Sequence, residues 1–147
     1  PGIEKVAPEL KEGLETMGAP PAAREQSAKR FQTLLQTVRI LHEAGVPIVA
    51  GTDQAVPGFS VDREIELYVK AGFTPMEAIQ AATLVPARAM GMEKDSGTIE
   101  AGKRADVILV DGNPLENISD LRKISLVFAA GRMFQPRPLW MAVGFKP

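Results

Sequence analysis

The sequence predicts an α/β fold in which helices cover a buried parallel strand and a β-rich tail follows. Helical periodicity dominates residues 22–44. A run of β-formers at 46–50 has apolar side chains towards both faces, which is typical of a parallel strand covered on both sides. From about Met92 onwards, glycines separate short strand patterns. We therefore expect two parts, residues 1–91 and residues 92–147.

Composition narrows the class of protein. The 147 residues are 45% apolar and 24% charged, with a formal net charge of -1, which is ordinary for a globular protein. This charge gives no bulk attraction to nucleic acid or to an anionic membrane, and no apolar run is long enough for a transmembrane helix. Cysteine is absent and histidine occurs once, at His42. The chain starts at Pro1 without a leader, so we expect a processed chain or a piece of a longer one, and its compartment stays open.

Residues 1–21 show only a weak helical pattern, and residues 22–44 show a regular one. The stretch "ELKEGLETMG" predicts a short helix that ends at Gly18. Over residues 22–44, apolar side chains recur at three- and four-residue spacings, and Gly45 marks the end of the helix. The expected strand at 46–50 follows at once. The inner face of the long helix is predicted to carry Phe31, Leu34, Leu35, Val38, Leu41 and His42.

Further helices follow the loop after the strand. The stretch "VDREIELYVKAG" predicts a helix over 61–72 with apolar residues on its inner side. The next helix has a complete start signal, because Thr74 is an N-cap, Pro75 stands at the first helical position and Glu77 closes a capping box. A shorter helix is predicted from Pro86.

The tail is predicted as short strands joined by turns. "SGTIEAGKRADVILVDGNP" contains two strand patterns, and "ISLVFAAGRMF" predicts a hairpin with strands at 125–129 and 133–135 and Gly131-Arg132 in the turn. The glycine-containing stretches 97–103 and 112–114 lack the strand-to-helix context of a phosphate-binding loop, so we interpret them as turns. The final "QPRPLWMAVGFKP" is expected to be a loosely attached arm.

Two residues are candidates for chemistry. Asp53 follows the predicted strand directly, and a carboxylate at such a place typically binds a metal, a cation or a helix end. An Asp in a loop can instead cap the following turn. As the single histidine, His42 is a candidate metal ligand. However, it lies near the C-terminal end of its predicted helix, where the macrodipole favours a histidine and the ring can pack between layers. We favour packing for His42. Phe59 fits either the lining of a substrate pocket or the packing of the loop.

Four stretches together resemble a known family. "AGVPIVAGTD", "AGFTPMEAIQAATLVPARAMGM", "SGTIEAGKRADVILVDGNPLENI" and "VFAAGRMF" occur in an order and spacing similar to the C-terminal part of the metal-dependent amidohydrolase superfamily, in its imidazolonepropionase-like and prolidase-like branch. The match runs from about Arg39 to Phe134. The resemblance implies the C-terminal part of a (β/α)₈ TIM barrel, with residues 1–91 as its last βα units. Residues 92–147 would then be strands of the accompanying β-sandwich and a tail.

The same resemblance implies hydrolysis of C–N bonds in a small amide, cyclic amide or dipeptide-like substrate by a metal-activated water. In such enzymes an Asp at the end of the eighth strand ligates a divalent metal, with zinc the favoured choice, and acts as general base. Asp53 corresponds to that residue. The sequence departs from the family pattern, because it contains no His-x-His pair, and Asp62-Arg63 stands where many members carry a histidine. A chain with one histidine cannot supply the usual ligands.

These departures leave two functions open. The chain is either a fragment of a hydrolase or a non-catalytic folding or interaction module derived from the same region, and alone it need hold no metal. A partial barrel exposes strand edges and apolar surface, so we expect a homo-oligomer or association with a missing N-terminal barrel portion. No nucleic-acid or membrane partner is expected. Calcium binding is disfavoured, since no Asp-x-Asp-x-Asp-Gly spacing occurs.

Overall fold

The computed structural model describes residues 20–53 and 59–142, together with residues 5, 6, 8, 11, 144 and 145. The short helix predicted to end at Gly18 lies almost entirely outside these residues. The described elements are the 3₁₀ helices η2 (Pro21–Ala23) and η3 (Ile118–Arg122), the α-helices α2 (Arg24–Glu43), α3 (Ser60–Ala71), α4 (Pro75–Ala81), α5 (Leu84–Ala89) and α6 (Pro136–Ala142), and the strands β1 (Val107–Val110), β2 (Ile124–Ala129) and β3 (Arg132–Phe134).

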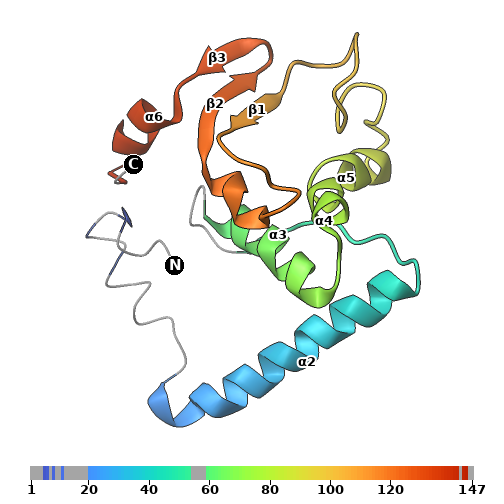
Figure 1. Ribbon diagram of the computed structural model, residues 1–147, viewed down its shortest axis with the longest axis vertical. Coiled ribbons are helices and arrows are strands. Elements are labelled where there is room, and N and C mark those ends of the chain that lie inside the picture. The colour runs from blue at the N-terminus through green and yellow to red at the C-terminus, as the bar shows by residue number, and fades with distance from the viewer. Residues whose placement is uncertain are drawn as a thin grey trace.

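Helix α2 confirms the predicted long helix, but only a few of its side chains pack against the core. Gly45 follows it with a φ of +76°, as the predicted stop requires. Of the side chains in α2 none is buried; Leu35 and Val38 are partly buried against the core. Leu34 is 63% exposed, so the predicted inner face is only partly covered. In Figure 1, α2 runs along the lower side of the molecule, with α3 between it and the tail.

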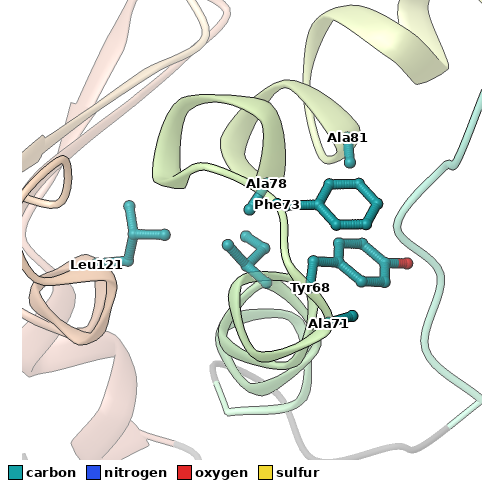
Figure 2. Packing of buried hydrophobic residues seen from close by; sticks show 7 residues of the cluster. Tyr68, Ala71, Phe73, Ala78, Ala81 and Leu121 are labelled. Carbon is teal, nitrogen blue, oxygen red and sulfur yellow. The ribbon is translucent and has the colours of Figure 1, made fainter. Parts of the chain in front are cut away.

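The core lies where α3, α4 and η3 meet. Helix α3 buries Ile65, Tyr68 and Ala71, and the ring of Tyr68 stacks on that of Phe73 with centroids 5.2 Å apart. Figure 2 shows Leu121 of η3 on the opposite side of this cluster from the two rings. The remaining buried members are Ala78 and Ala81 of α4. The predicted helix over 61–72 is thereby confirmed, and so is its packing role.

Helix α4 starts with the capping box that the sequence predicts. The Thr74 hydroxyl accepts a hydrogen bond from the Glu77 amide at 3.3 Å, and the Thr74 amide donates to the Glu77 carboxylate at 2.8 Å. These bonds satisfy two of the amide groups that a helix start leaves without partners. Helix α5 begins at Leu84, two residues before the predicted Pro86.

The prediction of a strand at residues 46–50 is wrong. This segment belongs to no sheet among the described residues; its partners are helical. The Ala50 amide donates to the Ala81 carbonyl at 2.7 Å, and the Tyr68 hydroxyl donates to the Val49 carbonyl at 3.3 Å. A strand needs an adjacent strand to complete its backbone hydrogen bonds, and local apolar pattern does not supply one. Only one side of the segment is covered, since Ile48 packs on the core while Val49 is 44% exposed.

Within the described residues, the tail forms one antiparallel sheet in the order β1-β2-β3. The predicted hairpin is confirmed, but its turn is Ala130-Gly131, and Arg132 already pairs with Ala129. Ala130 and Gly131 both have positive φ, +49° and +76°, which suits the right-handed twist of a two-residue hairpin. Of the two strand patterns predicted before it, only β1 forms; residues 97–103 make turns and bends.

The C-terminal arm packs more closely than predicted. Phe145 is 5% exposed, and its ring centroid lies 5.3 Å from that of Trp140 and 6.1 Å from that of Phe59. The expectation of a loose arm is therefore wrong, because three aromatic rings attach it next to the start of α3. Phe59 accordingly has a packing role. No helix within the described ranges is both long and apolar enough to cross a bilayer.

Candidate functional site

Asp53 lies at the end of the extended segment that α3 and α4 hold, and it is exposed. On its N-terminal side, the backbone of Val49 and Ala50 is fixed by Tyr68 and Ala81. On its C-terminal side, α3 begins at Ser60. The remainder of the loop, residues 54–58, lies outside the described residues. The backbone just before Asp53 is thus fixed by α3 and α4. The Asp53 carboxylate itself is exposed and can contact a ligand or a substrate.

The described residues do not form a complete metal centre. No three histidine, aspartate or glutamate side chains in the described part of the chain gather closely enough to hold an ion. Zinc sites take three or more protein ligands, and magnesium or calcium sites take several oxygen ligands. Asp53 can contribute one carboxylate ligand, so the rest of any site must come from groups beyond those described here.

His42 packs at the junction of α2 and α4. Its ring stacks on Phe73 with centroids 3.7 Å apart and an interplanar angle of 15°, and its Nε2 lies 3.6 Å from Oε2 of Glu77. Hydrogen bonds from the side chain and backbone of Thr74 lower the pKa of Glu77, so a carboxylate that is ionised at neutral pH lies beside the His42 ring. These contacts confirm the predicted packing role of His42.

A buried polar cluster between α3 and η3 is absent from the sequence predictions. Glu66 accepts hydrogen bonds from Arg122 Nε at 2.8 Å, Ser119 Oγ at 3.0 Å and Arg63 Nη1 at 3.1 Å. Burial raises the pKa of Glu66, but these three donors outweigh it and bring the pKa to about 2. Burial also raises the pKa of the neighbouring Asp62, against the attraction of Arg122.

A signal for this cluster does exist in the sequence. Asp62 and Glu66 are four residues apart and share the α3 face that carries Ile65 and Val69, where apolar residues are expected. They are only 8% and 9% exposed. Two acids on a buried helical face indicate that cations or other donors pack against them. Which cation it is cannot be found from spacing, because Arg122 is far away in sequence.

Two aspartates of the tail hold its turns together through hydrogen bonds to backbone amides. Asp106 accepts a hydrogen bond from the Ala130 amide at 2.6 Å and pairs with Arg104, so it closes the β2–β3 turn. Asp120 accepts from the Asn113 amide at 3.0 Å and so fixes the loop at 112–114. A Cβ on Gly112 would lie 2.4 Å from the Asp120 carboxylate, which explains the glycine there. The interpretation of these stretches as turns is confirmed.

The chain is similar to several known hydrolases. The family model described as the Amidohydrolase family matches residues 17–134. The imidazolonepropionase of Shouchella clausii is 33% identical over 103 residues, which cover 65% of this chain and 23% of that protein. The ochratoxinase of Aspergillus niger is 37% identical over 98 residues, which cover 63% of this chain and 20% of that protein.

Solved structures of related hydrolases are also similar to this chain. A Xaa-Pro dipeptidase with bound methionine superposes with a TM-score of 0.67 at 36% identity, covering 79% of this chain and 29% of that one. A prolidase complexed with N-methylphosphonate-L-proline has a TM-score of 0.67 at 27% identity, covering 90% of this chain and 33% of that one. The chain thus spans about a fifth of these curated relatives and no more than a third of these solved chains. The α/β class and the resemblance to the imidazolonepropionase-like and prolidase-like branch are confirmed, and the chain belongs to the amidohydrolase family.

Proposed function

We propose that this chain is the C-terminal portion of a metal-dependent amidohydrolase that hydrolyses C–N bonds. In this proposal residues 1–91 are the last βα units of a TIM barrel and residues 92–147 are strands of a β-sandwich with a tail. The observation that carries the proposal is Asp53, an exposed carboxylate at the end of a backbone segment fixed on α3 and α4. The family match over 17–134 supports the architecture.

The catalytic role that we propose for Asp53 is proton transfer. Its carboxylate accepts the proton of the attacking water and returns it to the leaving nitrogen. A divalent metal, with zinc the first choice, would supply the lowered pKa that the attacking water needs. Asp53 would serve as one of its ligands, and a short side chain on a fixed backbone keeps the carboxylate in place with few free rotations. Other ligands lie beyond the described residues, or in another copy or segment that associates with the exposed apolar surface.

The proposed substrates are small amides, cyclic amides or dipeptide-like molecules. The names of similar proteins support this class, since they include an imidazolonepropionase, a Xaa-Pro dipeptidase and a 5-methylthioadenosine/S-adenosylhomocysteine deaminase. All three are names of enzymes that hydrolyse C–N bonds.

The first test is the isosteric variant Asp53→Asn in the full-length protein. It keeps the size of the side chain but removes the proton acceptor, so kcat on a panel of dipeptides and cyclic amides should fall by at least about 100-fold. Asp111→Asn, which neutralises another exposed aspartate, is the matched control and should keep wild-type activity. Undiminished hydrolysis by the Asp53 variant would remove it from the reaction.

A second candidate is a non-catalytic folding or interaction module. It is favoured by one observation, that Asp53 has no companion ligands among the described residues. Hydrolysis of any panel substrate by the wild-type protein, lost with Asp53→Asn, argues against this candidate. A protein without metal and without hydrolysis would favour it.

A further inference from the structure

The contact between α3 and η3 depends on a single cation from the tail. Among the described contacts of Glu66, Arg122 makes the shortest, 2.8 Å, and its positive charge also acts on Asp62 one helical turn earlier. Its side chain is 25% exposed, against 39% for that of Arg63, which belongs to α3 itself. Arg122 is therefore the charged group that joins the tail to α3.

Without this cation, Glu66 keeps only Arg63 and Ser119 among its described donors, and its negative charge acts more strongly on that of Asp62. Asp62 and Glu66 are nearly buried, and like charges four residues apart on a helix repel each other. A buried charge that loses its partner destabilises its surroundings far more than an exposed one. Because Asp62 lies in the first turn of α3, the strain would act at the N-terminal end of that helix.

That end of α3 adjoins the loop that follows Asp53. Ser60 begins the helix, and Phe59, just before it, packs against the Trp140 ring at a centroid distance of 5.7 Å. The other side of Asp53 is held by α3 as well, through the Tyr68 hydroxyl and the Val49 carbonyl. A displacement of α3 relative to the tail would therefore move the start of α3 and the Tyr68 hydroxyl that holds Val49, while the bond between Ala50 and Ala81 of α4 would stay in place.

We propose that Arg122 is a positioning residue, which holds the N-terminal half of α3 against the tail and so fixes the segment that carries Asp53. The catalytic part of this inference rests on the proposed function. The structural part rests on the contacts of Glu66 with Arg122 and Ser119 and on the burial of the neighbouring Asp62. Arg122 itself takes no part in the reaction.

Hydrogen exchange tests the structural part in the full-length protein. Arg122→Met should raise amide exchange by about tenfold over residues 60–66 and leave α4 unchanged. Arg122→Lys, which restores a cation, should recover part of the protection. Lys123→Met is the matched control, because Lys123, just after η3, is 60% exposed and pairs with Asp120 and not with Glu66. If Arg122→Met does not fold, Glu66→Gln should show the same local effect at smaller size.

Kinetics tests the positioning part. For Arg122→Met we expect kcat to fall by about tenfold or more while KM changes little, with partial rescue in Arg122→Lys. Exchange that is unchanged over residues 60–66, or that rises equally in α4, overturns the inference. Local loosening with an unchanged kcat also overturns it. A wild-type protein without hydrolysis would contradict the proposed function instead, and the exchange comparison would still decide whether Arg122 holds α3.

Discussion

At the scale of single residues, the charged side chains between α3 and η3 connect two elements that are far apart in sequence. The single histidine, His42, has a local packing role. Glu66 stays ionised although it is 9% exposed, because Arg122, Ser119 and Arg63 all donate to it. His42, by contrast, is explained by its stack on Phe73. The residue that carries the proposed chemistry, Asp53, is exposed and lies apart from any cluster of ligands in the described chain.

The depressed pKa of Glu66 predicts a pH-dependent stability. Its pKa falls from 4.5 to about 2 on folding, so its stabilisation is complete above about pH 4.5 and is lost as the pH falls towards 2. The contribution is at most roughly 3 kcal/mol. Urea unfolding of wild type and Glu66→Gln should therefore differ most at neutral pH and converge near pH 2. Asp62 acts in the opposite direction, since its raised pKa favours the protonated form in the folded state and so offsets part of this loss.

The comparison between the two proteins reports Glu66 together with its effect on Asp62, because the more distant carboxylates are the same in both. A stability difference that stays constant from pH 7 to pH 2 would contradict the assignment of the low pKa to Glu66.

At the scale of elements, the sequence predicts what local signals determine. The long helix, the Thr74 capping box and the β2–β3 hairpin follow from spacing, caps and turn residues that lie within a few positions of one another. The strand at 46–50 fails because a strand is defined by its neighbours, and the apolar pattern says nothing about whether they are present. The Glu66–Arg122 pair was missed for the same reason, since its partners come together only through the tertiary fold.

The capping box gives a quantitative prediction for α4. Thr74→Ala removes the acceptor for the Glu77 amide and should lower the free energy of unfolding by about 1 kcal/mol. Chemical denaturation measures the change. Thr37→Ala is the control, because this exposed hydroxyl donates to a carbonyl within α2 and its loss should change stability by about 0.5 kcal/mol or less. Equal losses in the free energy of unfolding for Thr74→Ala and Thr37→Ala would contradict a stabilising role for the Thr74 cap.

At the scale of the whole molecule, the described chain leaves apolar surface uncovered. Ile99 is 85% exposed, and Ile108 and Leu109 of β1 are 45% and 47% exposed. Ile99 and Ile108 lie on a groove of about 600 Å³ beside α4. Strand β1 also stands at an edge of the sheet. Such features support the proposal that this chain associates, either with another copy or with a further barrel portion, and the latter would bring the ligands that Asp53 lacks.

The measurement that tests the central claim most directly is the divalent metal content of the purified full-length protein beside Asp53→Asn, with Asp111→Asn as control. We expect roughly one or more tightly held ions per chain in wild type and control, and loss of metal in Asp53→Asn. Metal that stays fully bound in Asp53→Asn, or a wild-type protein that binds none when zinc is supplied, would contradict it.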